Sequence, residues 1–336
     1  MAVKLSDFDY HLPRELIAQK PLPRRDASRL MVLRGSAIEH RIFREIVEYL
    51  GKGDVLVFNN SRVIPARLRG KKPTGGAVEL LLVRELKENL WECMFRGRLV
   101  EGTRVHFAHG LSAEVEQKRE GTAVMRFYGG DIKREMWKIG EVPAPPYIKR
   151  RVSSDEYQTV YASVNGSVAA PTAGFHFTVE LLDKLRSMGV EFAFITLHVG
   201  PGTFLPVRHE DVEKHRMHEE QFSIHPAEAD IINSALEEGR RIFAVGTTTV
   251  RALESAFHGG RIKPGVATTS LFIYPGYEFR VPYAGLITNF HLPRSTLILL
   301  VSAFAGKERI LRAYREAVRL RYRFYSFGDA MLILRQ

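Results

Sequence analysis

The chain has 336 residues, 45% hydrophobic and 26% charged, a balance typical of a globular protein of one or two domains. Lys and Arg outnumber Asp and Glu by 49 to 38, and the net charge of +11 favours a polyanionic partner, either nucleic acid or a phosphorylated ligand. A single cysteine, Cys93, excludes a disulfide framework, a CxxC zinc site and an iron–sulfur cluster held by several thiolates.

The cysteine content and the apolar runs also bear on location. One cysteine suggests a reducing compartment. No signal-like segment opens the chain, and the longest apolar run, residues 296–305, is too short to cross a bilayer. We therefore expect a cytoplasmic protein without a membrane partner, in which this run forms a buried helix.

In chain order, a helix and a buried strand are predicted first, within residues 44–60. Short alternating segments without a long helix come next, the pattern of a small antiparallel barrel or sandwich. The six candidate strands are residues 63–70, 76–86, 90–97, 103–108, 111–118 and 122–129. A short helix at 131–140 and a Pro-rich hinge at 141–151 follow, since three prolines keep the chain extended.

Beyond the hinge, strands and helices alternate, which indicates a largely parallel sheet or an incomplete βα barrel. The predicted helices are 178–188, 226–239, 247–257, 294–306 and 307–324, and the predicted strands are 190–199, 221–224, 240–246, 267–274, 285–290 and 330–334. We predict an α/β fold: a discontinuous, barrel-like α/β main domain from residues 1–60 and 150–336, with a small six-stranded antiparallel β-barrel inserted at 61–149.

Polar residues follow three predicted strands of the main domain, where parallel α/β sheets bind their ligands. In chain order they are His198, Gly200, Gly202 and Thr203; Gly246, Thr247, Thr248, Thr249 and Arg251; and Asn289, His291, Arg294, Ser295 and Thr296. Because each group joins a strand to a helix, we expect their hydroxyls and backbone N–H groups to converge on one pocket. Plain helix capping and tight packing are the alternative for each junction.

A fourth junction, "GSVAAPTAGFHFT" at 166–178, is nearly free of large side chains before His176. Such a segment lets a flat ligand lie directly on the backbone, with Thr172, Gly174 and Phe175 as candidate contacts. Phe175 and Phe177 either stack on a purine or fill the core, and we expect the core for one of them.

Common cofactor and metal motifs are missing. The P-loop pattern is absent, and "GPGTFL" at 200–205 lacks the third glycine of a dinucleotide site. "HRMHEEQF" at 215–222 does not have HExxH spacing, so we predict a solvated helix face there and no metal site.

One face of the last predicted helix carries a row of arginines, which suggests a track for a phosphate backbone. Its members are Arg309, Arg312, Arg315, Arg319 and Arg323. Lys149, Arg150 and Arg151 after the hinge, and the basic residues at 67–72, extend this candidate RNA surface. An ordinary solvated face is the alternative.

Several longer segments are specific enough to suggest a family. They include "VFNNSRVIPARL", "GEVPAPPYI", "GSVAAPTAGFHFT", "TLHVGPGTFLPV", "VGTTTVRALES", "ITNFHLPRSTLILLVSAFAG" and "YRFYSFGDAMLIL". Together they resemble the S-adenosylmethionine:tRNA ribosyltransferase-isomerase family of queuosine biosynthesis, over nearly the whole chain and in order. The resemblance also implies an α/β barrel-like domain with an inserted β-barrel.

The resemblance implies S-adenosylmethionine as co-substrate and, as partner, a tRNA with 7-aminomethyl-7-deazaguanine at the wobble position. The ribosyl part would be transferred to the aminomethyl group and isomerised, giving epoxyqueuosine and releasing adenine and methionine. Such a reaction needs a base for the ribose 5′ proton and a hydrogen-bond donor for the leaving adenine. The oligomeric state stays open, a monomer included.

Histidine can give or take a proton near neutrality, so the preferred candidates for this chemistry are His176, His198 and His291, with Glu219 and Glu220 behind them. A buried structural role is the alternative for each histidine. The run Thr247–Thr249 and Arg251 suit ribose hydroxyls or the methionine carboxylate. Two other functions remain: a non-catalytic RNA-binding module, and a βα-barrel enzyme for a small phosphorylated metabolite.

Overall fold

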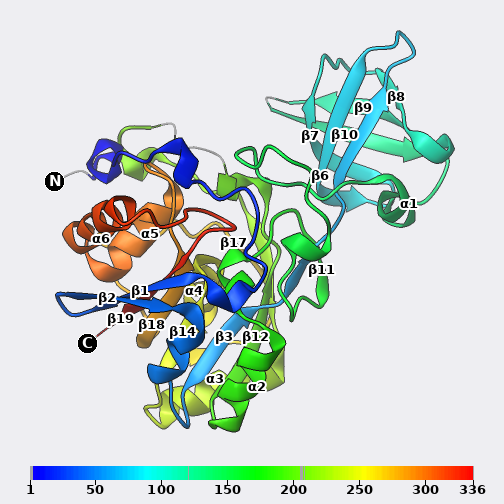
Figure 1. The fold of residues 1–336 in the computed structure, drawn as a ribbon. Helices are drawn as coiled ribbons and strands as arrows, with labels where there is room; N and C mark the ends of the chain where they lie inside the picture. Colours follow the sequence, from blue (N-terminus) through cyan, green and yellow to red (C-terminus); the bar gives the residue numbers. More distant parts are fainter. Residues whose placement is uncertain (1–2, 120, 205–206, 208, 336) are drawn as a thin grey trace.

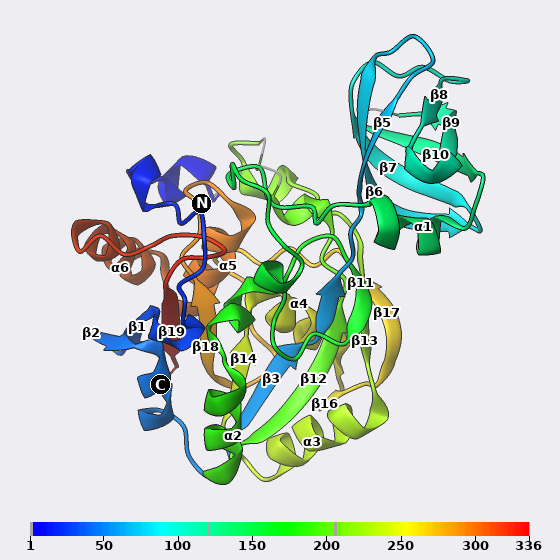
Figure 2. The same cartoon turned by 45° about the vertical axis from the view of Figure 1, so that its right-hand side comes forward.

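The computed structural model describes residues 3–119, 121–204, 207 and 209–335, without the side chains of 203 and 204. A main domain holds a nine-stranded sheet, and a small β-barrel projects from one end of it (Figures 1 and 2). The predicted α/β class with an inserted six-stranded antiparallel barrel is confirmed.

The main sheet is mixed and open, with β17 and β2 at its two edges. Its strands, in spatial order, are β17 (Gly265–Thr269), β13 (Glu220–Ile224), β12 (Glu191–Leu197), β3 (Val55–Asn59), β14 (Ile242–Val245), β18 (Tyr283–Asn289), β19 (Ala330–Leu334), β1 (Arg29–Arg34) and β2 (Ala37–Ile42). The four central strands β12, β3, β14 and β18 run parallel, whereas β13 and β19 on either side of them pair antiparallel. Of the two arrangements that the sequence allowed, the main domain therefore has the open sheet with a parallel centre.

The inner strands of this sheet are buried on both faces, and their successive side chains point to opposite sides. In β1, Met31 and Leu33 join one core cluster and Leu30 and Val32 join another. The first cluster is covered by α3 (Pro226–Glu237), α4 (Thr247–Ala256), α5 (Thr296–Ala305) and α6 (Lys307–Arg319), and the second by α2 (Val179–Ser187) and the 3-10 helix η4 (Phe43–Glu48). The main domain thus has three layers, with the sheet between two layers of helices.

The barrel has its own core. It closes in the order β10 (Thr122–Tyr128), β7 (Leu90–Arg96), β6 (Ala77–Lys87), β5 (Arg67–Lys71), β8 (Arg104–His106) and β9 (Ser112–Lys118). Leu68, Leu80 and Cys93 point inward and are fully buried, and burial raises the pKa of the Cys93 thiol. The short helix α1 (Ile132–Ile139) follows, capped by Asp131.

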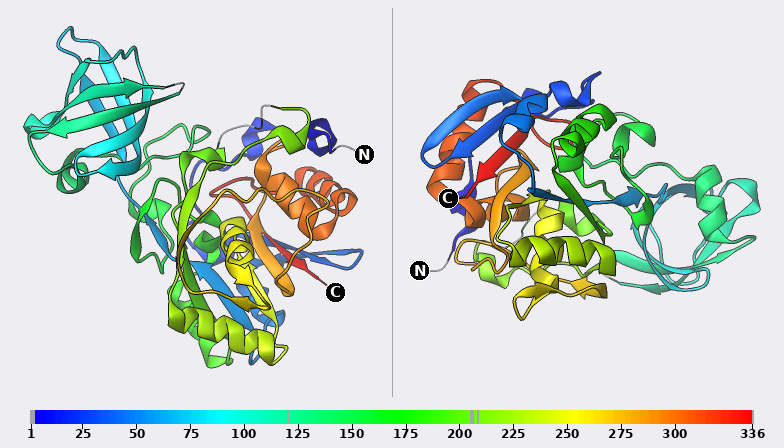
Figure 3. Two further views of the ribbon diagram at one scale, coloured as in Figure 1. Left: turned by 180° about the vertical axis from the view of Figure 1, so that it is seen from behind. Right: turned by 90° about the horizontal axis from the view of Figure 1, so that it is seen from below.

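Two crossings join the barrel to the main domain. The outgoing segment forms β4 (Ser61–Val63), which pairs in parallel with β11 (Val164–Ser167) on the way back. Figure 3 shows from behind and from below that the barrel stands off at this end. The predicted domain borders at 61 and 149 stay predictions.

Three predicted elements are wrong in extent or type. The last helix ends at Arg319 rather than 324, because Arg321 has a positive φ of 53° and the Tyr322 N–H turns back to the Ala317 carbonyl at 2.8 Å. The strand predicted at 267–274 stops at Thr269. Residues 215–222 do not form a helix, since Glu220 already opens β13. The short hairpin of β15 (Phe257–His258) and β16 (Arg261–Ile262) was not expected.

Candidate active site

The predicted strand ends meet at one cavity beyond the carboxyl ends of β14 and β18, here named the central cavity. Its volume is about 50 Å³. Of the predicted site residues it is lined by Thr172, Gly246, Thr247, Thr248, Asn289 and His291. The small residues Ala169, Ala170 and Ala173 form part of the wall, as the sequence at 166–178 suggested.

The start of α4 is shaped by Gly246, whose φ of 94° lets the chain turn sharply from β14 into the helix. Thr247 and Thr248 follow on the first turn and reach the cavity. The Asn59 amide donates to Thr248 Oγ1 at 3.3 Å and so fixes that hydroxyl. Thr249 instead donates to the Val245 carbonyl at 2.7 Å, which makes it part of the helix and not of the cavity wall.

Asn289 connects the cavity to His176. Its Oδ1 accepts from Thr172 Oγ1 at 3.2 Å. Its Nδ2 lies 3.2 Å from both His176 Nε2 and the Tyr325 carbonyl. Because the amide can donate to both, His176 Nε2 acts as the acceptor, which places the ring proton on Nδ1 toward Ser28 Oγ at 2.7 Å.

The imidazole of His176 is neutral in this setting. Burial lowers its pKa to about 3, and the nearby guanidinium groups of Arg323 and Arg25 act in the same direction. The ring packs against Phe43 with centroids 5.0 Å apart. His176 therefore lies behind the central cavity and reaches it through Asn289.

His291 lines the cavity itself and is also neutral, since burial lowers its pKa to about 3. Its Nε2 lies 2.9 Å from Thr288 Oγ1. The Tyr314 hydroxyl accepts from its backbone N–H at 3.0 Å, and Tyr10 donates to its carbonyl. The third histidine, His198, is half-buried against Gly166, where an added Cβ would lie 2.6 Å from the ring.

A buried ion pair adjoins the cavity. Arg251 and Glu220 are in contact with side chains only 5% and 3% exposed, and the Gly200 N–H donates to Glu220 Oε1 at 2.8 Å. Arg251 also donates from Nε to the Leu271 carbonyl at 2.9 Å. Its buried Nη2 has no hydrogen-bond partner among the described residues.

Arg251 and Thr296 line a second, smaller hollow, here named the side cavity. Thr247 and Thr248 border both cavities, so the two are neighbours. The side cavity is closed by Met217 and Phe272.

Other candidates lie elsewhere. The Glu219 side chain is 57% exposed and accepts from Thr268 at 2.9 Å, away from both cavities. Arg294 is exposed and pairs with Glu210 at 3.3 Å. Ser295 caps α5, where it accepts from the Ile298 N–H at 3.3 Å.

The remaining candidates of the loops pack against protein. A Cβ on Gly174 would lie 1.9 Å from the Tyr161 hydroxyl, and one on Gly202 would lie 2.7 Å from the His218 ring. The Thr203 side chain lies outside the described residues.

The two phenylalanines of this segment differ. Phe177 is fully buried between Phe43 and Phe58, as expected for one of them. Phe175 stacks on Phe327 and lies beside His176.

Among the cavity residues that were not predicted, three come from segments near the Pro-rich hinge and the end of the chain. Tyr147, Tyr325 and Ser326 line the central cavity, and the Tyr147 hydroxyl lies 2.5 Å from Ser326 Oγ. The rings of Tyr147 and Tyr325 are 4.0 Å apart at 69°. The one indication in the sequence that these residues matter was that they fall in "GEVPAPPYI" and "YRFYSFGDAMLIL", two segments that carried the resemblance.

The predicted arginine row is shorter than expected. Arg312, Arg315 and Arg319 are exposed on α6, but Arg319 is paired with Glu316 at 2.6 Å. Arg309 is half-buried. Arg323 is not on the helix at all and lies near His176.

The basic residues after the hinge are partly paired. Arg150 forms an ion pair with Glu156 at 2.8 Å, and Arg151 forms one with Glu141 at 3.2 Å. The Lys149 side chain is exposed, and its backbone N–H donates to Gln19 Oε1 at 3.0 Å.

Neither a metal cluster nor a membrane segment is found in the described parts of the chain. No three His, Cys, Asp or Glu side chains there come close enough to hold an ion, and none of the described helices has the length and apolarity to span a bilayer.

Comparison with known proteins decides the family. A family model described as a queuosine biosynthesis protein matches residues 5–333. The chain belongs to this family. A relative from Thermotoga petrophila, named S-adenosylmethionine:tRNA ribosyltransferase-isomerase, is 54% identical over 337 residues, covering 99% of this chain and 100% of its own. A relative of the same name from Thermus thermophilus is 54% identical over 345 residues, covering 98% and 99%.

A solved structure agrees. The crystal structure of S-adenosylmethionine tRNA ribosyltransferase from Thermotoga maritima is similar with a TM-score of 0.57 and 43% identity, over 98% of this chain and 100% of that one. The resemblance seen in the sequence is confirmed, and the chain is an enzyme of this family. The two other functions considered, an RNA-binding module and an enzyme for a small phosphorylated metabolite, are not supported.

Proposed function

We propose that this chain transfers the ribosyl part of S-adenosylmethionine to the aminomethyl group of 7-aminomethyl-7-deazaguanine at the tRNA wobble position and isomerises it. The product on tRNA is epoxyqueuosine, and adenine and methionine leave. Membership of the queuosine family supports the reaction. The observation that carries the site is the meeting of Thr247, Thr248, Asn289 and His291 at the central cavity. The reaction takes place in the cytoplasm, together with tRNA.

The two adjoining cavities suggest how S-adenosylmethionine lies. Its nucleoside occupies the central cavity, where Thr247 and Thr248 offer hydroxyls to the ribose. Its methionine part occupies the side cavity, where the unpartnered Nη2 of Arg251 is available to the carboxylate. Met217 and Phe272 form an apolar wall for the methylene groups.

Both cavities must open for this ligand. The central cavity of about 50 Å³ and the side cavity of about 10 Å³ are far below the roughly 300 Å³ at which ligand pockets begin. Tyr147 and Tyr325 are large side chains in the wall of the central cavity that come from loops rather than from the sheet, so we expect them to move aside.

We assign the proton transfer to His291. A base must reach the substrate and be unprotonated at neutral pH. His291 lines the cavity, and burial lowers its pKa to about 3, which keeps the ring neutral but makes it a weaker base than a free imidazole, so its position in the cavity is what supports the assignment. His176 meets only the second, so it is a positioning residue that orients Asn289. Glu220 is engaged by Arg251 and Glu219 is exposed.

Labelled S-adenosylmethionine tests the proposal. The enzyme should release adenine and leave a ribosyl adduct on RNA only with tRNA that carries the deazaguanine precursor. His291→Gln should lower turnover by about a hundredfold or more, the contribution of a general base. A His291→Gln enzyme that is folded and turns over like wild type would remove His291 from the proton transfer, and absence of adenine release by wild type would refute the reaction.

A further inference from the structure

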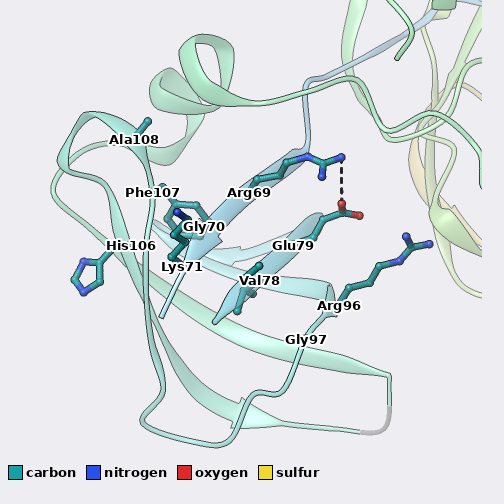
Figure 4. A pocket seen from close by; sticks show the side chains of 11 residues that line it. Arg69, Gly70, Lys71, Val78, Glu79, Arg96, Gly97, His106, Phe107 and Ala108 are labelled. Carbon is teal, nitrogen blue, oxygen red and sulfur yellow. Dashed lines mark ion pairs between the residues drawn. The ribbon is translucent and has the colours of Figure 1, made fainter. Parts of the chain in front are cut away.

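The barrel has a hollow of about 670 Å³ on its outer surface that the reaction with S-adenosylmethionine does not explain. It is formed by β5, β6 and β7 together with the segment of β8 and the residues that follow it (Figure 4). We propose that this hollow, with the groove that continues it toward the main domain, binds the sugar–phosphate backbone of the tRNA substrate. This inference rests on the proposed function.

The sequence of β5 explains the charge of the hollow. Because side chains alternate along a strand, Arg67, Arg69 and Lys71 share the outer face while Leu68 is buried inside the barrel. Across the sheet Arg69 pairs in register with Glu79, and Glu79 with Arg96.

Figure 4 shows Arg69, Glu79 and Arg96 extending to the same side from three neighbouring strands, with the ion pair of Arg69 and Glu79 at 3.5 Å. Arg69 is also paired with Glu141 at 3.1 Å, so the positive charge of this hollow comes mainly from Arg96 and Lys71.

The hollow is adjacent to a second groove of about 460 Å³, and Arg69 lines both. This groove lies between the barrel and the Pro-rich segment, and Lys149 and Arg151 stand on its other wall. Trp137 of α1 also lines it and is 48% exposed. An exposed aromatic ring in a basic groove is the arrangement on which proteins stack unpaired bases.

The Pro-rich wall leads from this groove to the central cavity. Ala144 and Ile148 face the groove, whereas Tyr147 between them lines the central cavity. A tRNA whose backbone lies in the groove would therefore pass next to the cavity into which its wobble base has to enter.

Charge favours this path over the arginine row of α6. Among the described residues that line the two hollows, seven are Lys or Arg and only Glu79 and Glu141 are acidic. The α6 row lies at the opposite end of the main domain from the barrel (Figures 1 and 3). Arg319 there is paired with Glu316, but Arg69 and Arg150 are paired with Glu141 and Glu156 as well, so the excess of cations in the two hollows and their position favour this path, not the ion pair of Arg319.

Binding of tRNA to charge variants tests the inference. In the full-length protein, Arg69→Gln, Lys71→Gln and Arg96→Gln together should raise the Kd for precursor tRNA on the order of tenfold to a hundredfold. The slope of log K against log salt should become shallower by about 2–3, since each of the three lost phosphate contacts removes about 0.7–0.9. Trp137→Ala should raise the Kd about fivefold or more without changing that slope.

Two controls make the result specific. Arg126→Gln and Lys133→Gln remove barrel cations that are paired with Glu116 and Glu85 and line neither hollow, so tRNA binding should stay as in wild type. Binding of S-adenosylmethionine alone should be unchanged in the hollow variants.

A hollow variant with the Kd and salt slope of wild type overturns the inference, and a loss seen instead with Arg312→Gln and Arg315→Gln moves the interface to α6. Adenine release is measured separately. If wild type binds tRNA through the hollow but releases no adenine, the proposed reaction fails while this interface stands.

Discussion

Two neutral histidines in the core of the main domain make its stability depend on pH in a defined way. Burial lowers the pKa of His176 and of His291 from 6.5 to about 3. Between pH 6.5 and 3 the unfolded chain binds a proton at each imidazole that the native protein does not bind. The free energy of unfolding is therefore unaffected by these groups above pH 6.5 and falls as the pH is lowered below it.

The size of the effect follows from the two pKa values. At pH 5.0, 1.5 units below the unfolded value, each histidine costs about 2 kcal/mol, and the pair about 4 kcal/mol. His176→Gln keeps an oxygen that can accept from Asn289 but cannot titrate. We expect this variant to be less stable at pH 7.5, yet to lose about 2 kcal/mol less than wild type between pH 7.5 and 5.0.

Denaturant unfolding at the two pH values measures this difference. Far-UV circular dichroism is the suitable signal, because α2 to α6 lie in the main domain whereas Trp91 and Trp137 both lie in the barrel and its helix. His258→Gln, on an exposed strand of the main domain, is the matched control and should keep the wild-type difference. If His176→Gln loses as much stability on acidification as wild type does, His176 is not a neutral buried group and the reasoning fails.

Two further predictions concern packing at the site. Gly174→Ala should destabilise the protein by about 1–3 kcal/mol, because its Cβ would lie 1.9 Å from the Tyr161 hydroxyl. Adding Tyr161→Phe should restore part of the lost melting temperature. It should not restore all of it, since the added Cβ would still lie 2.8 Å from Tyr161 Cζ. No recovery at all in the double variant would rule out this contact as the cause. Arg251→Met should cost about 3–5 kcal/mol by leaving Glu220 buried without its cation. Adding Glu220→Gln should recover most of that stability but not the affinity for S-adenosylmethionine by calorimetry, and recovered affinity would contradict the role given to Arg251.

The barrel could be predicted from sequence because its strands pair with strands that are near them along the chain. Each of its strands pairs with another between residues 67 and 128, and the alternation around Leu68 and Leu80 shows directly which side faces inward. The order of the main sheet could not be predicted in this way. Leu30 of β1 pairs with Ala330 of β19, and the hydrophobic pattern around either residue does not indicate which strand lies next to it.

Site residues could be predicted where they lie at the ends of strands, but not where they come from loops. Thr247, Asn289 and His291 reach the cavity as the geometry of parallel strands requires. Ser295 has the same sequence context but caps α5, because a hydroxyl after a strand can face either a ligand or the backbone. Tyr147 comes from a segment whose place in space depends on how the barrel is attached, so beyond its place in a segment that carried the resemblance, its position in sequence gave no sign of its role.

The pairing of β1 with β19 also sets the order in which the protein can form during synthesis. The strands of the barrel are complete once residue 128 has been synthesised. In contrast, β1 pairs with β19, which follows it by 300 residues in the chain. Until then β1 and β18 have unpaired apolar edges, which favour aggregation. A ribosome that stops before residue 330 thus releases a chain with a finished barrel and a main domain in which β1 and β18 lack the strand that joins them.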